Sequence, residues 1–369
     1  MNAALTERLL DWYDRNRRDL PWRQDRDPYR IWVSEIMLQQ TRVEAVIPYY
    51  QRFLQRFPTL RALAEAPEEE VLSYWQGLGY YSRVRNLQQG VREVLSRYGG
   101  TVPQTPEAVK KLPGVGDYTA GAILSIAHNK PHPAVDGNVL RVISRLHRIE
   151  DPIEQSRTRK RVEQLVQELM DRTERYGDFT QALMELGALV CTPRSPRCPD
   201  CPWLQSCGAA RDGVQGELPK KKTAEPPRQV QVYTGILIAE GKVLAVRRPD
   251  TGLLAGMWQF PASEGLTPGL HSSELQAALL AVFSALGQTV ALGEAWRRLT
   301  HVFSHRQWNL HSYLCDATEP DFNESTSLRW LTSAEMAMVN WAGPYRILAA
   351  DVQSELMNSS NKEQDKKGK

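Results

Sequence analysis

In the first 209 residues, apolar side chains recur every three or four positions, the spacing of a helix with one buried face. Prolines and glycine pairs separate these periodic stretches, and none has the strict alternation of a strand. We therefore expect an almost entirely helical region. The expected helices cover residues 6–17, 29–41, 43–57, 68–78, 83–98, 106–111, 118–127, 138–146, 157–173 and 179–190.

The pattern changes near residue 210. Residues 210–229 are polar, rich in proline, glycine and lysine, and without periodicity, which indicates a linker. From Val230 the chain alternates as a strand does, and Glu240-Gly241 separates two such runs, as in a hairpin. The elements expected beyond the hairpin are a helix over 274–286 and a strand over 308–314, which makes 230–355 an α+β domain, and then a charged, disordered tail over 356–369.

The composition sets limits without indicating a function. With 369 residues, 41% hydrophobic and 24% charged, the chain is typical of a soluble globular protein of two or three domains. The apolar run at 122–127 is too short to span a bilayer, and the N-terminus lacks the apolar core of a signal peptide. We therefore expect a cytoplasmic protein. Residues 1–225 carry 33 Lys and Arg against 29 Asp and Glu, and the remainder carries 13 against 14, so any affinity for nucleic acid belongs to the first part.

A glycine-rich turn, Leu112-Pro113-Gly114-Val115-Gly116, lies between two expected helices. Glycine permits a sharp turn and lets backbone N–H groups approach a phosphate, while the next helix adds the partial positive charge of its N-terminus. A plain helix–helix turn is the alternative. Together with Thr119 and Ala120, the turn favours a helix-hairpin-helix that holds a DNA phosphate without reading the sequence.

Two carboxylates are placed where they are able to do chemistry. Asp136 precedes an expected helix, where a capping role alone would explain it, but an ionised carboxylate there also stabilises a cationic transition state. Glu35 has apolar helical neighbours on every side, so its pKa should be raised toward the range of a general acid. A solvated surface glutamate is the alternative for Glu35. The run ends on Gln39-Gln40-Thr41, small polar groups able to contact bases.

Four of the five cysteines fall within seventeen residues, at Cys191, Cys198, Cys201 and Cys207, while Cys315 is alone. In a cytoplasmic chain this clustering favours a metal site over disulfides or unpaired thiols. The spacing leaves zinc and an iron–sulfur cluster both open. Arg194 and Arg197 lie between the first two cysteines and suggest a basic loop that faces DNA. Ordinary solvated charge is the alternative.

In combination, these motifs resemble the helix-hairpin-helix glycosylases whose iron–sulfur members include endonuclease III. Over about 350 residues the chain is most similar to the MutY-type adenine DNA glycosylases. Relatives with lyase activity carry a lysine where this chain has Tyr118, so a simple glycosylase without a strand-cleaving amine is implied. The matching stretches are LPWR (20–23), WVSEIMLQQTRV (32–43), GLGYYSRVRNL (77–87), AVDGNVLRV (134–142) and ELGALVCTPRSPRCPDCPWLQSC (185–207).

The resemblance implies a multidomain fold. An all-α glycosylase region over 1–209 would contain a six-helix barrel over about 23–130 and a cluster module, made of 1–22 plus 131–209, that holds one [4Fe-4S] cluster on the four cysteines. A Nudix-like (MutT-like) α+β domain would follow the linker and recognise 8-oxoguanine. The loop implied to contact the lesion contains Phe303, Ser304 and His305. A simple turn at a strand edge is the alternative interpretation of this loop.

Nudix hydrolysis is the rival interpretation of the second domain. A Nudix hydrolase needs several glutamates on one helix to hold magnesium, whereas residues 272–287 contain only Glu274. The TGLLAGMWQFP stretch (251–261) and HVFSHRQWNL (301–310) resemble the MutT-like domain of MutY proteins. The domain is therefore expected to have lost catalysis and to serve recognition.

The implied reaction belongs to base excision repair: hydrolysis of the glycosidic bond of adenine paired with 8-oxoguanine or guanine, after the adenine is flipped out of duplex DNA. Glu35 would protonate adenine N7, and Asp136, held by Tyr118 and Asn138, would stabilise the cationic sugar. Gln181 receives no role, because its position varies in character in the family. The residues implied to contact the base or the DNA are Trp22, Arg23, Gln40, Thr41, Leu78, Tyr80, Gly114 and Gly116.

The implied partner is double-stranded DNA, bound by a monomer in the nucleoid of a bacterial cytoplasm without contact with a membrane. Two other functions are weighed. A glycosylase–lyase for damaged pyrimidines, of the endonuclease III type, is disfavoured by Tyr118 and by the second domain. A non-catalytic DNA-binding protein that senses lesions or redox state is disfavoured by the presence of both Glu35 and Asp136.

Overall fold

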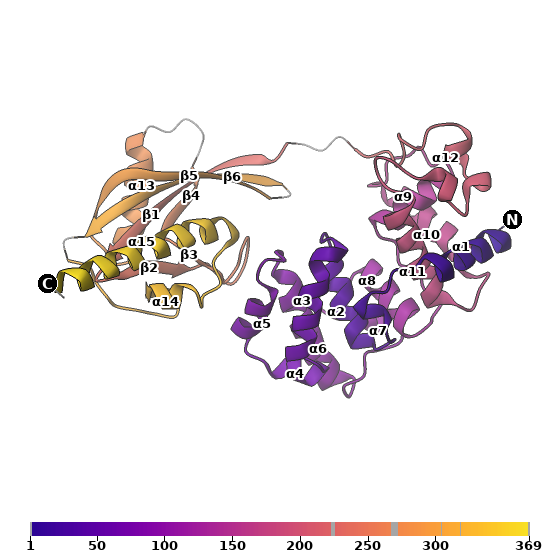
Figure 1. Cartoon of the computed structure of the whole chain (residues 1–369), viewed down its shortest axis with the longest axis horizontal. Coiled ribbons are helices and arrows are strands. Elements are labelled where there is room, and N and C mark those ends of the chain that lie inside the picture. The colour runs from indigo at the N-terminus through magenta and orange to yellow at the C-terminus, as the bar shows by residue number, and fades with distance from the viewer. Residues whose placement is uncertain (1, 223–225, 267–271, 304, 318, 368–369) are drawn as a thin grey trace. The chain divides into compact units, whose positions relative to one another are not determined.

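The structure is a computed structural model that describes residues 2–222, 226–266, 272–303, 305–317 and 319–367 (Figure 1). The chain divides into two compact units, Met1–Thr223 and Ala224–Lys369. Among the helices described, none is both long enough and apolar enough to cross a membrane.

The first unit is helical throughout, as its periodicity predicts (Figure 1). Two short α-helices were not expected, α4 with six residues and α12 with four, because so few residues do not establish a period. The expected helix over 118–127 is α-helical at first and then continues as a short π-helix, η2. The elements are α1 (Asn2–Asn16), η1 (Pro21–Arg23), α2 (Pro28–Leu38), α3 (Val43–Arg56), α4 (Leu60–Glu65), α5 (Glu68–Trp75), α6 (Ser82–Arg97), α7 (Pro106–Val109), α8 (Asp117–Ala122), η2 (Ile123–Ala127), α9 (Gly137–Leu146), α10 (Ser156–Met170), α11 (Tyr176–Leu189), η3 (Cys198–Asp200), η4 (Leu204–Ser206) and α12 (Gly208–Arg211).

Two large hydrophobic cores organise this unit, beside a small cluster of Ile31, Ala122, Ile126 and Ala134. One is built from residues between Leu20 and Leu124, around Trp32, Phe53 and Trp75. The other combines α1 with residues from Val139 to Trp203, so the start of the chain packs against α10 and α11. We propose to identify the first core with the six-helix barrel and the second with the cluster module.

The boundary between the units lies later than the composition suggested. Leu218 is 3% exposed, and its carbonyl accepts a hydrogen bond from Arg145. The carbonyl of Lys220 accepts one from the backbone N–H of Ile153. The expected linker over 210–229 is therefore packed on the first unit up to Lys222. Composition alone missed this because a single apolar anchor lies within an otherwise polar stretch.

The second unit is an α+β fold, as expected, and its hairpin is present with Ile238 opposite Val243. The sheet has the strand order β3-β2-β1-β6-β5, in which β1 and β6 run parallel, while β4 pairs with β1 and β7 with β2. The elements are β1 (Arg228–Ala239), β2 (Lys242–Arg247), β3 (Trp258–Gln259), β4 (Ala262–Leu266), α13 (Ser272–Ala285), β5 (Val290–Val302), β6 (Arg306–Ala317), β7 (Leu328–Thr332), α14 (Ser333–Met336) and α15 (Gly343–Lys367).

Helices α13 and α15 cover opposite faces of this sheet (Figure 1). Phe283 of α13 fills the space above Gly235, beside Cys315 of β6. Tyr345 of α15 packs edge-on against Trp308, which also belongs to β6. Because side chains alternate along a strand, Trp308 and Cys315 point to opposite faces. The core is thus a sheet between two helices.

The expected disordered tail over 356–369 is helical as far as the structure describes it, because α15 continues to Lys367. This segment contains no glycine or proline before Gly368, and lysine, glutamate and glutamine have good helix propensity. Nothing in its sequence therefore ends the helix that begins at Gly343. Charge content alone was a poor guide to its structure.

Candidate active site

A cavity of about 150 Å³ in the first unit gathers seven of the expected site residues, including all four that were expected to be catalytic. It lies where η1, α2, α8, η2, the start of α9 and α11 meet. Gln40, Leu78, Tyr80 and the two hairpin glycines do not line it. The expected residues that do are Trp22, Arg23, Glu35, Thr41, Tyr118, Asp136 and Asn138.

Glu35 is buried on α2, 5% exposed, within the apolar surroundings that its sequence neighbours predicted. This burial raises the pKa of its carboxyl group to about 7, against the opposing effect of a hydrogen bond that the Tyr118 hydroxyl donates to Oε2. Glu35 is thus protonated in a large fraction of molecules at neutral pH. The resemblance placed Tyr118 against Asp136, but its hydrogen bond goes to Glu35.

Asp136 is the N-cap of α9, and both of its oxygens accept hydrogen bonds. Oδ1 accepts from the backbone N–H of Val139 at 2.7 Å, and Oδ2 accepts from Asn138 Nδ2 at 2.8 Å. Burial raises the pKa of Asp136, and the bonds from Val139 and Asn138 oppose that rise. Capping therefore fixes the carboxylate within the cavity, and the two interpretations of Asp136 are compatible.

A chain of hydrogen bonds runs from Asp136 to the cysteine loop. Asn138 Oδ1 accepts from Arg141 Nη2 at 2.8 Å, and Arg141 Nε donates to the carbonyl of Cys191 at 2.7 Å. Gly187 lets α11 approach this chain, because a Cβ there would lie 2.7 Å from that of Asn138. The orientation of Asp136 therefore depends on packing between α9, α11 and the first cysteine.

The same cavity holds an ionised carboxylate that was not expected from the sequence. Glu185, 1% exposed, pairs with Arg18 Nε at 3.0 Å and Arg23 Nη2 at 2.9 Å. Burial acts to raise its pKa, but the hydrogen bonds from both arginines outweigh burial and lower the pKa to about 2. The available signal was the one used for Glu35, an isolated acid in an apolar helix. Gln181, which received no role, lines the cavity one helical turn away on α11.

The glycine turn forms a helical hairpin between α7 and α8, outside the cavity. Gly114 has φ +74°, and a Cβ there would lie 2.7 Å from that of Asn86. Gly116 is the N-cap of α8, and no side chain caps this helix. The N-terminal N–H groups of α8 are therefore free of a side-chain cap, as a helix that binds a phosphate requires.

The four cysteines line a second cavity in this unit, together with Arg145 and Val190. Four thiols that line one small cavity are a donor set that suits either a zinc ion or an iron–sulfur cluster. Arg145 is 2% exposed and donates a hydrogen bond to Cys191 Sγ at 3.3 Å. Its positive charge can compensate the negative charge of a thiolate at Cys191.

The expected recognition loop joins β5 and β6 in the second unit. The ring of Phe303 packs edge-on against His301 and Trp308, and its backbone N–H donates to the carbonyl of Arg306 at 2.7 Å. His305 is exposed. Ser304 lies outside the described residues.

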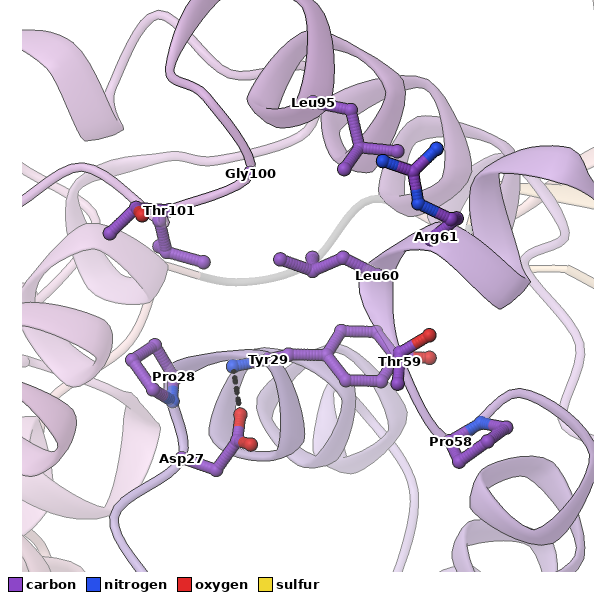
Figure 2. Close-up of a pocket in the computed structure, with 11 residues that line it drawn as sticks. Asp27, Pro28, Tyr29, Pro58, Thr59, Leu60, Arg61, Leu95, Gly100 and Thr101 are labelled. Atoms are coloured by element: carbon purple, nitrogen blue, oxygen red, sulfur yellow. Dashed lines mark hydrogen bonds between the residues drawn. The ribbon is translucent and has the colours of Figure 1, made fainter.

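A separate hollow in the first unit contains none of the expected site residues (Figure 2). It lies beside the N-termini of α2 and α4. Figure 2 shows the carboxylate of Asp27 hydrogen-bonded to the backbone N–H of Tyr29, at 2.8 Å. Asp27 caps α2 as Asp136 caps α9, but no second carboxylate lines this hollow. It therefore provides an internal reference for a cap without catalytic surroundings.

Comparisons with known proteins identify the families that the two units resemble. Residues 33–170 match the HhH-GPD superfamily of base excision DNA repair proteins, and residues 233–350 match the NUDIX domain. The chain is 39% identical to an adenine DNA glycosylase of Rattus norvegicus, covering 90% of this chain and 75% of the relative. It is 38% identical to an adenine DNA glycosylase of Homo sapiens, covering 90% of this chain and 71% of the relative. A solved thermostable thymine-DNA glycosylase superposes with a TM-score of 0.51 and 30% identity, covering 57% of this chain and 97% of that one.

Proposed function

The chain belongs to the adenine DNA glycosylase family, and we propose that it hydrolyses the glycosidic bond of adenine paired with 8-oxoguanine or guanine in duplex DNA. One observation carries this proposal. A single cavity holds Glu35, whose pKa is about 7, together with Asp136, whose two oxygens are both held by hydrogen bonds. A proton donor beside a fixed carboxylate is what cleavage of a glycosidic bond requires.

The reaction proceeds on an adenine that has left the base stack and entered the cavity. Glu35 gives its proton to adenine N7, so the bond between N9 and C1′ breaks and its electron pair leaves with the base. The carboxylate of Asp136 stabilises the positive charge that develops on the sugar. Water then adds to C1′ and gives a proton to the Glu35 carboxylate, which restores the acid, and the products are free adenine and an abasic site.

Glu185 fixes two arginines at the edge of this cavity. Its ionised carboxylate is 1% exposed and accepts hydrogen bonds from Arg18 and Arg23 on both oxygens. It therefore serves to hold Arg18 and Arg23 in place beside the adenine.

The four cysteines would hold one [4Fe-4S] cluster. The shared cavity of Cys191, Cys198, Cys201 and Cys207 and the buried cation of Arg145 support this assignment. When bound, the cluster would cross-link the loop over 191–207 and fix it against α9. Through Arg141 and Asn138, this chain's own hydrogen bonds would extend that order to Asp136.

We assign 8-oxoguanine recognition to the second unit, with its loop at Phe303, Ser304 and His305. The match to the NUDIX domain and the single glutamate of α13 support a domain that binds an oxidised nucleotide without hydrolysing it. We further propose that the protein acts as a monomer.

The first expected result is adenine release by the purified protein from a duplex containing 8-oxoguanine opposite adenine, in a single-turnover assay. Because Tyr118 offers no amine, the strand should remain intact until alkali is added. Denaturing gel electrophoresis with alkali measures adenine release, and the same gel without alkali measures strand cleavage by the protein. Strand cleavage without alkali would identify a lyase, and an intact glycosidic bond would refute the proposed function.

The second expected result concerns the metal. Anaerobically prepared protein should contain about four iron and four sulfide ions per chain and absorb broadly in the visible blue. Cys198→Ser should lose the iron, whereas Cys315→Ala should retain it, because Cys315 lies in the core of the second unit. Metal analysis and absorbance measure both variants. Stoichiometric zinc in the wild-type protein would contradict the cluster.

A further inference from the structure

Arg83 of α6 connects two turns that are distant in sequence. Its Nη1 donates to the carbonyl of Ile36 at 2.8 Å and to that of Gln39, at the end of α2. Its Nη2 donates to the carbonyls of Leu78 and Gly79, each at 3.2 Å. One guanidinium therefore holds the backbone of the turn after α2 and of the turn before α6.

Each of these turns contains a residue in a strained backbone conformation. Gln40 has φ +58° and Tyr80 has φ +48°. Both values lie in the left-handed region, which residues other than glycine rarely adopt. Such a conformation is energetically unfavourable for any residue that carries a Cβ. The carbonyl that immediately precedes each strained residue, that of Gln39 or Gly79, is an acceptor of Arg83. The guanidinium thus stabilises both strained turns at the same place in each.

The charge of Arg83 has no acidic counterpart among the interactions described for it. Burial lowers its pKa to about 10, with Tyr80 acting in the opposite direction, so the guanidinium stays protonated at neutral pH. Its cation lies 5.6 Å from the ring centre of Trp75 and 5.4 Å from that of Tyr80. Carbonyl oxygens and aromatic faces are therefore its partners, which suits a group that shapes backbone.

Tyr80 is the large apolar side chain that this arrangement presents to solvent. It is 51% exposed, whereas its neighbour Leu78 is 8% exposed. An exposed aromatic ring on a braced turn is suited to enter a base stack, because no backbone has to be ordered when it inserts. Gln40 is presented from the other turn in the same way.

We propose that Arg83 is a positioning residue that locks the Gln40 and Tyr80 turns into one rigid unit, so that both side chains enter the DNA together when adenine is extruded. The proposal rests on the proposed function, since it concerns extrusion of that adenine. Lysine should not replace Arg83, because one ammonium group with three donors does not span the carbonyls of two turns.

The test compares base unstacking with chemistry in the full-length protein. The duplex carries 8-oxoguanine opposite adenine, with 2-aminopurine beside the adenine as a fluorescent reporter of unstacking. Arg83→Lys should lower the unstacking equilibrium and the single-turnover rate together, by about tenfold. The pH midpoint of the remaining activity should stay at the wild-type value, because Glu35 is untouched. Arg92→Lys is the matched control, since Arg92 also lies on α6 and donates to a backbone carbonyl, that of Ala64.

A double-mutant cycle separates positioning from general stability. In a Tyr80→Ala background, Arg83→Lys should lower unstacking much less than in the wild type, because the ring it positions is gone. Gly79→Ala is a second probe that leaves the guanidinium in place. It strains the same turn through φ +71° with open space around the new Cβ, and it should reproduce the unstacking loss if Arg83→Lys folds poorly.

The outcomes separate this inference from the function on which it rests. A wild-type protein that neither unstacks nor releases adenine refutes the proposed function. An active wild type in which Arg83→Lys and Tyr80→Ala have fully additive effects, or in which a folded Arg83→Lys or Gly79→Ala unstacks normally, overturns the positioning role alone. A shifted pH midpoint in Arg83→Lys also overturns it.

Discussion

Asp136→Asn should abolish adenine release, lowering the single-turnover rate at least about a thousandfold. The substitution removes the negative charge that faces the developing sugar cation, and the amide nitrogen that replaces Oδ2 no longer accepts the bond from Asn138 Nδ2. Asparagine caps a helix nearly as well as aspartate, so the bond from Val139 N–H and the fold should persist. Quenched-flow or manual single-turnover assays on the 8-oxoguanine:adenine duplex measure the rate, and thermal unfolding confirms the fold.

Asp27→Asn is the matched control for this loss. Asp27 also caps a helix, through Tyr29 and Arg30, but lies in the hollow of Figure 2, away from Glu35 and the cysteine loop. Its variant should keep the wild-type rate. Equal adenine release by Asp136→Asn and the wild type would refute the proposed role of Asp136. Loss of activity in both variants would mean that the substitution damages capping instead.

Glu35→Gln should remove the general acid and lower the rate by at least about a hundredfold. In the wild type, the carboxyl group must be protonated to act, and its pKa is about 7. The rate should therefore fall as pH rises through 7. At low pH it should fall again as Asp136, whose pKa is raised by burial, gains a proton. A pH–rate profile of single-turnover constants tests this bell shape, and Glu35→Gln should lack the alkaline limb.

The same pKa shift predicts a gain in stability for Glu35→Gln. The folded state holds the Glu35 proton up to about pH 7, whereas the unfolded chain releases it near 4.5. The wild type should therefore lose stability between pH 4.5 and 7, by about 3 kcal/mol in total. Urea unfolding should show the variant more stable than the wild type at pH 8 and nearly equal to it at pH 4.5. A variant that is less stable at pH 8 would contradict the buried, pKa-shifted carboxyl group.

The sequence by itself determined the local features of this protein. Periodicity located nearly all of the helices, because a helix buries one face at a fixed repeat. The isolation of Glu35 among apolar neighbours predicted its burial, and the position of Asp136 before a helical pattern predicted its cap. The glycine turn and the spacing of the cysteines are equally local, because each depends only on residues within about twenty positions.

Only the tertiary structure decided which groups meet across the chain. Arg18 and Glu185 are 167 positions apart, and neither has a local signal for the other. Tyr118 bonds Glu35 instead of Asp136 because the packing of α8 against α2 directs its hydroxyl. Arg83 bridges the turn after α2 and the turn before α6 because the packing of these helices brings the two turns to one guanidinium. Such pairs depend on which helix faces come together, and that is settled by the burial of two separate cores.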